Sequence, residues 1–486
     1  MLANLLRQLV GRTEPAPAGS PATEAQADIG AVRGAVHAHL RDGRLAEALV
    51  EIAPALAAGA GVAEIRTLCD FSIRNAAALA RQDAWRRDIA YLLGAILLAL
   101  DDEEGALLCL RVSWPGDGAL AGLRRFSRGQ DIVEYCREAG LPCEQFAALV
   151  PQRMDGRTEP QLAAQLDAAP AALCMLPDAL VLGQSFLPVS REGLAFTERC
   201  TDSPAKLGRF DGIEQLDTLR LATEGRLWAA GGEARRHAGP HVLVGNHVNI
   251  GHWLLYFFTR TRQLRERPEL REAKVIVGED LLPLHAECLA RAGIAADRLV
   301  RLPAGAFAEF EQLWVPTLSC GISGRQVLYW APGTLDYVRG TLGVAPGAAR
   351  GRRRVYLSRR GARWRRLLNE DEVAAALAAL GFEEVDAGSL DLQQQIDLAG
   401  ETEAIVGCFG AGMNFHLFAG EGVPVVQIQP EAQPRMNIHV HLARALGQPF
   451  HALVAEVPVR HADPLRSDFR VPPDELKRVV SRALQG

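Results

Sequence analysis

After Pro151 the chain alternates short apolar runs with segments in which apolar residues recur every three or four positions. The runs at 241–247 and 273–280 are followed by two such segments, GHWLLYFFTRTRQLRER and LLPLHAECLARAG. Short apolar runs are typical of buried strands, and the wider spacing is typical of helices. Because parallel strands are joined by helical crossovers, the alternation predicts an α/β lobe over residues 151–325. Its first part, 172–196, has the pattern of β-hairpins or a β-meander.

A second α/β lobe is predicted over residues 326–486. Strand patterns at RRVYLSRR, FEEVDAG, AIVGCFGAG and VPVVQIQP alternate with helical patterns at NEDEVAAALAALG, LDLQQQIDLAGET and MNFHLFAGEG. After residue 430 we expect only helices. Two Rossmann-like lobes with a cleft between them form an arrangement that can hold a nucleotide-linked donor against an acceptor.

The N-terminal third has a different pattern. Residues 1–28 include the Pro- and Ala-rich stretch TEPAPAGSPATEAQA, which is typical of a flexible tail. Residues 29–150 carry apolar residues at helical spacing, and we predict an all-α domain there. The stretches LRDGRLAEALVEIAPAL and LLALDDEEGALLCLRV resemble degenerate tetratricopeptide-type helix pairs. This domain would either bind a protein partner or pack against the rest of the chain.

Composition narrows the class of protein. Of the 486 residues, 48% are hydrophobic and 23% are charged, which indicates a soluble, multi-domain globular protein. The formal net charge of −5 provides no overall basic field for nucleic acid. The nine cysteines include no C-x-x-C pair and no close histidine partner, which argues against both a disulfide framework and a zinc site.

The N-terminal sequence MLANLLRQLVGRTEPAPAG lacks the long apolar core and cleavage site of a secretory signal, so we expect a cytoplasmic protein. Its Leu-rich start would either touch the inner face of a membrane or form a frayed helix leading into the tail.

Nine arginines lie between residues 350 and 366, in RGRRRVYLSRRGARWRR. Those after the strand that ends at Ser358 follow its carboxyl end, where guanidinium groups can grip a diphosphate through paired, charge-assisted hydrogen bonds. Single-stranded RNA would also require several interleaved aromatics, and this stretch holds only Tyr356 and Trp364. The alternative is a solvated arginine face, an interpretation that we favour for residues 350–353.

The glycine-rich stretch IVGCFGAGMN (405–414) joins a predicted strand to a predicted helix. Free backbone N–H groups at the start of that helix would face the same anionic ligand as the arginines. The spacing is not the G-x-G-x-x-G fingerprint, and no acid stands at the position expected for ribose binding, which disfavours a dinucleotide cofactor. A tight strand-to-helix turn without a ligand explains the glycines equally well.

Several blocks in order, from NHVNIGHWLLYFFTR through VYLSRRGARWRRLLNEDEV to IVGCFGAGMNFHLF and VPVVQIQP, resemble glycosyltransferase family 61 over residues 170–455. The family includes capsular polysaccharide enzymes and xylosyl-, arabinosyl- and N-acetylglucosaminyltransferases. The resemblance implies a two-lobed GT-B architecture and transfer from a nucleotide sugar, with inversion, onto a glycan or protein acceptor. Synthesis of a surface or capsular glycan is the process we expect.

The resemblance also implies the site residues. The donor-binding residues that it assigns are Asn249, Ser358, Arg359, Arg365 or Arg366, Asn369, Glu370, Gly410, Ala411, Gly412, Met413 and Asn414. His252, followed by Trp253, is the candidate base, because an imidazole titrates near neutral pH and can accept the acceptor hydroxyl proton. The alternative is that His252 and Trp253 only pack their helix against the sheet. His247, Asp280 and Asp336 are the reserve candidates.

No D-x-D motif is present, so we expect neither a metal ion nor another cofactor besides the donor substrate. The sequence also departs from the family, because Phe409 replaces the usual histidine before Gly-Ala-Gly, Gln427 replaces an acid, and Tyr256 replaces another acid. The asparagine after Gly412 is shifted by one position, to Asn414. These changes favour a second hypothesis, a catalytically inactive GT-B-like scaffold or partner-binding protein.

Overall fold

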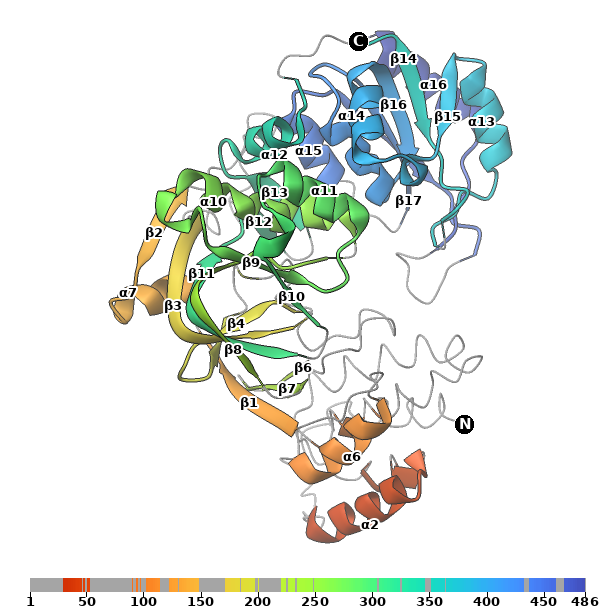
Figure 1. Cartoon of the computed structure of the whole chain (residues 1–486). Helices are drawn as coiled ribbons and strands as arrows, with labels where there is room; N and C mark the ends of the chain where they lie inside the picture. The colour runs from red at the N-terminus through yellow and green to blue at the C-terminus, as the bar shows by residue number, and fades with distance from the viewer. Residues whose placement is uncertain are drawn as a thin grey trace, which may run out of the picture. The chain divides into compact units, whose positions relative to one another are not determined.

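A computed structural model shows two compact units, which we describe separately (Figure 1). Unit 1 comprises Met1–Tyr135, Leu176–Gly239 and Leu302–Gln312, and unit 2 comprises Cys136–Met175, Pro240–Arg301 and Leu313–Gly486. The structure describes residues 29–45, 47–48, 50–52, 90, 93–94, 97, 102–113, 122–129, 131–147, 171–183, 185–196, 200, 220–223, 226–231, 234–247, 249–303, 306–323, 326–345, 351–362, 364–431, 437–459 and 467–485. None of the helices in these ranges is long and apolar enough to cross a membrane.

Unit 1 combines helices with a mixed sheet. Its elements are α2 (Ile29–Arg41), α6 (Glu103–Ser113), β1 (Gly122–Arg128), β4 (Leu187–Val189), β5 (Leu194–Ala195), β6 (Arg220–Thr223) and β7 (Arg226–Gly231). Strand β1 pairs antiparallel with β7 and parallel with β5. A buried hydrogen bond of 2.8 Å joins His37 Nε2 of α2 to Asp102 Oδ2, just before α6.

The range 29–150 is not wholly helical, in contrast to the sequence prediction. It contains α2, α6 and α7 (Ile132–Glu138), but also the strands β1 and β2 (Cys143–Ala147). The sequence of β1, GLRRFSR, buries only Phe126 among its described side chains, so its apolar periodicity is too weak to reveal a strand. Residues 53–89, which hold much of the helical pattern, lie outside the described residues.

Unit 2 begins with a lobe built around strands and short helices. Its elements are β9 (Lys274–Gly278), η5 (Pro268–Leu270), α11 (Pro283–Arg291), η6 (Ala296–Arg298), β12 (Cys320–Ser323), β13 (Gln326–Trp330) and α12 (Thr334–Leu342). The strands β3 (Ala171–Leu182), β8 (Arg235–Leu243), β10 (Leu299–Leu302) and β11 (Phe307–Pro316) have residues in both units. Within unit 2, β8 pairs parallel with β9 from His241 to Leu243, and β2 pairs antiparallel with β3.

The segment 251–267 differs from the single helix that its spacing predicts. It consists of α9 (Ile250–His252), a π-helical turn η3 (Trp253–Phe257), a 3-10 turn η4 (Phe258–Thr261) and α10 (Arg262–Glu266). Thr259 and Thr261 each donate a side-chain hydrogen bond to the carbonyl three residues earlier, at 2.9 and 2.6 Å. Such bonds compete with the regular helical ladder and change its pitch.

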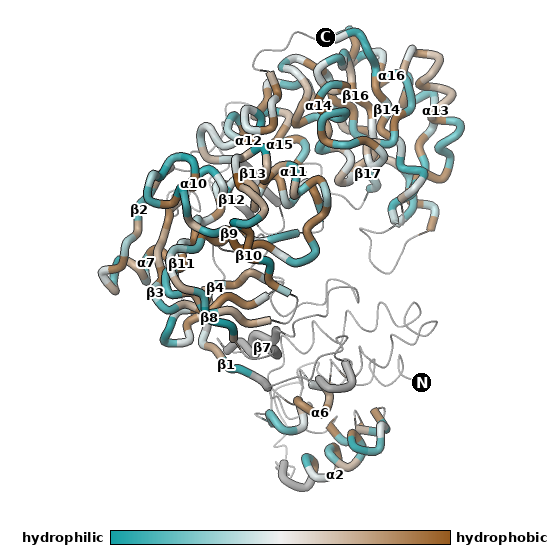
Figure 2. Tube along the Cα trace, in the orientation of Figure 1, coloured by the Kyte–Doolittle hydropathy of each residue, from teal (hydrophilic) through white to brown (hydrophobic). Residues whose placement is uncertain are grey.

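The second lobe of unit 2 is a five-stranded parallel sheet in the order β15-β14-β16-β17-β18. Its strands are β14 (Arg353–Leu357), β15 (Phe382–Val385), β16 (Thr402–Cys408), β17 (Val425–Pro430) and β18 (Phe450–Ala455). The first four lie where the sequence predicts strands. The fifth corrects the expectation of helices alone after residue 430. Figure 2 shows hydrophobic residues along β16, in keeping with a strand buried on both faces.

Helices cover both faces of this sheet. Helices α13 (Glu370–Ala378) and α16 (Pro473–Gln485) pack on the face that bears Tyr356 and Val406. Helices α14 (Leu392–Gly400) and α15 (Ile438–Ala445) pack on the other face, which bears Val355 and Ile405. The remaining 3-10 turns are η7 (Ala387–Ser389) and η8 (Ala411–Leu417).

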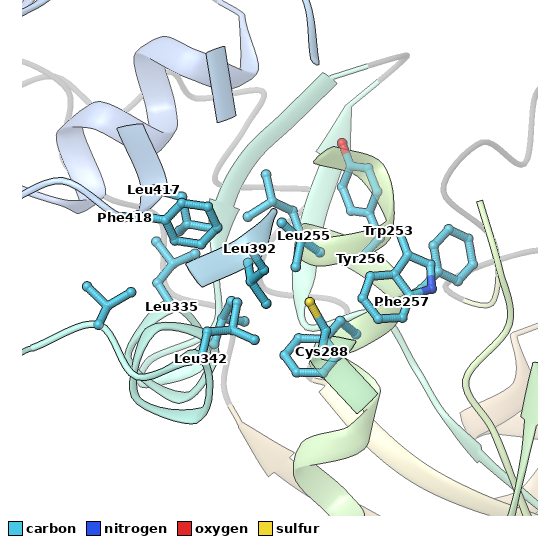
Figure 3. Packing of buried hydrophobic residues seen from close by; sticks show 14 of the residues in the cluster. Trp253, Leu255, Tyr256, Phe257, Cys288, Leu335, Leu342, Leu392, Leu417 and Phe418 are labelled. Atoms are coloured by element: carbon cyan, nitrogen blue, oxygen red, sulfur yellow. The ribbon is translucent and has the colours of Figure 1, made fainter. Parts of the chain in front are cut away.

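One apolar cluster spans both lobes of unit 2 (Figure 3). It joins Trp253, Leu255 and Cys288 of the first lobe to Leu392, Leu417 and Phe418 of the second. The mixed sheet and the parallel sheet are consistent with a GT-B-like fold. The domain boundaries that the sequence suggests, after residues 28, 150 and 325, stay predictions.

Gly351 provides a test of how β14 enters the sheet. Its N–H donates to Thr402 O at 3.2 Å, and a Cβ at this position would overlap the carbonyl of Glu401. We expect Gly351→Ala to lower the free energy of unfolding by about 2–4 kcal/mol, because the strand must shift away from β16. Urea unfolding measures this change. Gly361→Ala is the matched control, because a Cβ there meets nothing within 4 Å, and equal effects of both variants would refute the expectation.

Candidate functional site

The loop after β14 is organised by one carboxylate. Glu370, buried at the start of α13, accepts hydrogen bonds on Oε1 from Tyr356 Oη at 3.0 Å, Ser358 Oγ at 2.9 Å and Arg359 N at 2.8 Å. Burial, together with the nearby Cys408 and Glu370, raises the pKa of Tyr356 and keeps its hydroxyl protonated as a donor. Ser358 and Glu370, predicted as donor-binding residues, therefore bind each other and fix the start of the arginine loop.

Asn369 has a similar structural role. Its side chain makes no capping hydrogen bond at the start of α13. Its Nδ2 donates to Val471 O at 2.9 Å, and its Oδ1 accepts from Val471 N at 3.2 Å. This reciprocal pair satisfies both buried amide groups and ties the start of α13 to the segment before α16.

Arg359 braces the loop that follows. Its Nη2 donates to Trp364 O at 2.8 Å, and its Nε donates to Arg365 O at 3.3 Å. The same guanidinium lies so close to Gly410 that a Cβ at position 410 would overlap Nη1. The arginine loop and the glycine turn are thus in contact, and a Cβ at position 410 would require the Arg359 guanidinium to move.

Arg365 lies at the carboxyl end of β16. Its backbone has φ 56°, a left-handed conformation that is rare outside glycine, and its guanidinium lies 5.2 Å from the ring centroid of Phe409. The Phe409 ring also meets His439 of α15 edge-on, at 5.7 Å between ring centroids. Phe409, at the position where the family resemblance implies a histidine, is therefore flanked by a cation and by a histidine from another element.

Several other arginines of the stretch have carboxylate partners. Arg366 Nη2 contacts Asp468 at 2.6 Å, Arg360 pairs with Glu384 and Asp371, and Arg353 pairs with Glu383 and Glu401. These side chains are substantially exposed, and exposed ion pairs contribute little stability. Arg366 as a diphosphate ligand stays a prediction, while Arg359 and Arg365 lie against the glycine turn.

The glycine turn opens a short 3-10 helix, η8, in place of the predicted α-helix. Gly410 is extended, a Cβ on Gly412 would meet nothing within 4 Å, and Asn414 Nδ2 donates to Ala411 O at 2.8 Å. Met413 points into the core, where its Sδ would lie 2.6 Å from a Cβ on Gly407. The Met413 side chain thus packs under the turn, and its role in donor binding stays a prediction.

The His252 segment lies at the start of α9. Asn249 caps this helix, because its Oδ1 accepts from Gly251 N at 3.0 Å and from His252 N at 3.4 Å. The ring of His252 stacks on that of His247 at 4.6 Å and meets Tyr256 edge-on at 5.1 Å. His247 Nδ1 accepts from Asn249 N at 2.9 Å, so the neutral His247 ring carries its proton on Nε2.

Trp253 has a packing role, which is the alternative interpretation of the His252-Trp253 pair. It is fully buried and stacks on His285 at 4.3 Å. His252 is only half-buried, so its ring is accessible for proton transfer. Among the reserve candidates, Asp280 is exposed and accepts a hydrogen bond from Asn246, and Asp336 is exposed in the first turn of α12.

The two lobes of unit 2 meet at this point. A Cβ on Gly251 would overlap the amide of Asn414, so α9 lies directly against η8. Burial, and then the charges of His416, Arg365 and His252, lower the pKa of His439 well below its usual value. His439 also hydrogen-bonds the backbone of Gly410. The structure therefore brings together the three predicted segments around His252, Arg365 and Gly410.

Sequence reasoning missed His439. The signal was available in MNIHVHLARAL, where polar Asn437, His439 and His441 interrupt an otherwise apolar helix. All three are buried in the structure. Their positions next to β17 depend on long-range packing, which a helical pattern does not reveal.

Buried polar atoms without hydrogen-bond partners gather at this edge of the sheet. Within the described parts of the chain, Gln427 Oε1, Gln429 Nε2, His439 Nδ1 and Asn414 Oδ1 lack partners. The two glutamines are bound to each other, Gln427 Nε2 donating to Gln429 Oε1 at 2.7 Å. Unpaired buried polar groups cost free energy, which a polar ligand would recover. Groups of three or more His, Cys, Asp or Glu side chains suited to a metal ion do not occur in the described ranges.

The buried histidines predict a pH dependence of stability. Burial lowers the pKa of His416 to about 4, although its hydrogen bond with Gln448 opposes the shift. Because the unfolded state takes up a proton near pH 6.5 and the folded state only near pH 4, stability should fall as the pH drops through this window.

We expect His416→Asn, which keeps an amide donor for Gln448 and does not titrate, to be less stable at pH 7. Its free energy of unfolding should also change less steeply with pH, because unfolding of the variant takes up about one proton fewer between pH 6.5 and pH 4. Urea unfolding at pH 7, 6 and 5 measures how the free energy of unfolding of the wild type and of the variant depends on pH. Identical slopes for the two proteins would contradict the assignment.

The contact between α9 and η8 gives a second expectation. Gly251→Ala should displace Asn414 or move α9, and thereby separate His252 from the glycine turn. We expect nucleoside diphosphate affinity or turnover to fall by about tenfold or more. Isothermal titration and a turnover assay would report this. Gly340→Ala in α12 is the control, because a Cβ there meets nothing within 4 Å, and a matching loss in that variant would remove the support for the contact.

Comparison with known proteins agrees with this geometry. No curated protein matches the chain. The family described as Glycosyltransferase 61 matches residues 250–426, which include α9, the arginine loop, the glycine turn and the start of β17. This match confirms the resemblance noted in the sequence and implies sugar transfer. The chain therefore contains a glycosyltransferase family 61 domain over residues 250–426.

Proposed function

We propose that this protein is an inverting glycosyltransferase that moves a sugar from a nucleoside diphosphate sugar to a glycan or protein acceptor. The observation that carries the proposal is the approach of α9 to η8 at Gly251 and Asn414, with Arg359 and Arg365 at the same turn. A half-buried imidazole, two guanidinium groups and a glycine turn are the components that such a transfer requires.

In this mechanism His252 removes the proton from an acceptor hydroxyl. The acceptor oxygen then attacks the anomeric carbon from the face opposite the diphosphate, and the bond from that carbon to the leaving oxygen breaks. Inversion follows from this single displacement. The imidazole of His252 is suited to the task because its ring is held by His247 and Tyr256 on two sides.

Arg365 and the backbone at Gly410–Gly412 would stabilise the departing diphosphate. Arg365 is the candidate cation because its guanidinium lies 5.2 Å from the ring centroid of Phe409, the residue directly before Gly410. Guanidinium groups bind phosphate oxygens with short, charge-assisted hydrogen bonds, and the bond that forms strengthens as negative charge develops on the leaving group.

A catalytically inactive scaffold is the second candidate. It is favoured by Phe409, whose ring is enclosed by Arg365 and His439, and by Gln427, which is fully buried and bound to Gln429. The lobes of such a scaffold would bind a nucleotide or nothing. A role in surface or capsular glycan synthesis, a partner for the N-terminal region and a cytoplasmic location belong to the proposal and are expectations from the sequence.

A donor screen tests the proposal. The full-length protein is incubated with a panel of nucleotide sugars and candidate acceptors, and the release of nucleoside diphosphate is followed. We expect His252→Gln to lower kcat by about 100-fold or more, because the base is lost, while nucleoside diphosphate affinity stays within about threefold. An unchanged rate in this variant would show that His252 is not the base.

Binding measurements separate the two candidate functions. Arg365→Ala should weaken nucleoside diphosphate binding by about tenfold or more, because a charge-assisted contact is lost. Arg353→Ala, at the amino end of β14, is the matched control and should leave binding unchanged. Binding without turnover for every donor would favour the scaffold, and the absence of both binding and turnover would rule out the enzyme.

A further inference from the structure

Three cysteines form a cluster at one edge of unit 2, outside the candidate functional site. Cys136 lies in α7, Cys143 in β2 and Cys174 in β3. The Sγ atoms of Cys143 and Cys174 are 3.3 Å apart. Cys174 also shares a side-chain hydrogen bond with Cys136, so that one thiol contacts two others.

The strand register places two of these cysteines in the correct geometry for a covalent bond. Cys143 and Cys174 are directly opposite each other in the antiparallel pair β2–β3. Directly opposite residues have Cα atoms about 4.5–5.5 Å apart, within the range of about 4.4–6.8 Å that disulfides span. The backbone bond from Met175 N to Pro142 O, at 2.9 Å, holds the strands together beside the pair. A disulfide therefore requires the two sulfurs to approach each other and little movement of the backbone.

We propose that Cys143 and Cys174 are a reversible disulfide site that reacts with small-molecule disulfides. Cys143 is partly exposed, whereas Cys174 and Cys136 are buried, so the reagent reaches Cys143 first. The Cys143 thiolate attacks one sulfur of the reagent and releases the first small thiol. The Cys174 thiolate then attacks Cys143 Sγ and releases the second. The protein loses two protons and two electrons, and the small disulfide gains them and becomes two thiols.

Cys136 determines how specific the reaction is. Cys136 contacts Cys174 but is fully buried. It therefore cannot react with the small disulfide in solution to form the mixed disulfide of the first step. Hydrogen bonds with Cys136 and Cys143, followed by burial, raise the pKa of the Cys174 thiol. The second step is therefore slow at neutral pH and faster at higher pH, because only the thiolate attacks.

The disulfide would strengthen the attachment of β2 to the rest of unit 2. Glu144, next to Cys143, forms an ion pair with Arg267 at 2.5 Å, and Ala172, near Cys174, accepts a hydrogen bond from Thr317 N at 2.8 Å. A covalent bond between β2 and β3 would add to these contacts and close the loop between residues 143 and 174. Closing a loop of this length constrains the unfolded chain and raises the unfolding temperature.

Oxidation followed by peptide mapping tests the proposal. The full-length protein is incubated with excess oxidised glutathione, free thiols are blocked with an alkylating reagent, and the digest is analysed by mass spectrometry. We expect a Cys143–Cys174 cross-linked peptide, a loss of two alkylated cysteines, and a rise in Tm that dithiothreitol reverses. A Cys136–Cys174 bond, a glutathione adduct that persists on Cys143, or three unmodified thiols would each overturn the proposal.

Matched variants strengthen the test. Cys143→Ser should abolish both the cross-link and the redox-dependent change in Tm. Cys136→Ser and Cys288→Ser, the latter a buried cysteine of α11, should retain both. Loss of the cross-link in Cys136→Ser with normal folding would show that Cys136 takes part in the bond. The mapping of the unmodified protein remains decisive if a variant folds poorly.

Discussion

The geometry of the candidate site depends on the Glu370 carboxylate. One of its oxygens accepts three hydrogen bonds, from the hydroxyls of Tyr356 and Ser358 and from the backbone of Arg359. A charged acceptor in a buried position makes each of these bonds stronger than a neutral one. The carboxylate therefore fixes the direction in which the chain leaves β14. The direction of the chain after β14 in turn determines where Arg359 and Arg365 lie.

Arg359 transmits that constraint to the next strand. Its guanidinium binds two carbonyls of its own loop and lies against Gly410, which follows β16. Loops at the carboxyl ends of neighbouring parallel strands are thus held as one unit. Gly251 then brings α9 of the first lobe against the same turn. At two contact points of the site, a side chain lies directly against the backbone of a glycine: Arg359 against Gly410 and Asn414 against Gly251.

The sequence allowed most of this lobe to be predicted, and its limits have physical causes. The strands β14, β16 and β17 are buried and apolar, so their runs stand out clearly. Strand β18 lies at the edge of the sheet, where Ala452 and Val454 are exposed and the apolar pattern is weak. The family resemblance located the segments around His252 and Gly410.

Individual side chains were harder to assign than segments. Asn249, Asn369 and Glu370 are polar residues near a predicted ligand, but their hydrogen bonds are made within the protein. The side chain of Met413 packs inward in η8, a 3-10 helix where the sequence pattern predicts an α-helix. His439 could not be assigned because its neighbours, Phe409 and His416, come from other elements.

The shared apolar cluster of Figure 3 constrains how a substrate could enter and leave. Trp253 and Leu255 of one lobe are packed in the same core as Leu417 and Phe418 of the other. Swinging the lobes apart as rigid bodies would expose this core to water, at a cost of about 25 cal/mol for each Å² of apolar surface. We infer that ligand exchange proceeds through small movements of loops and side chains, so that product release need not await a large hinge motion.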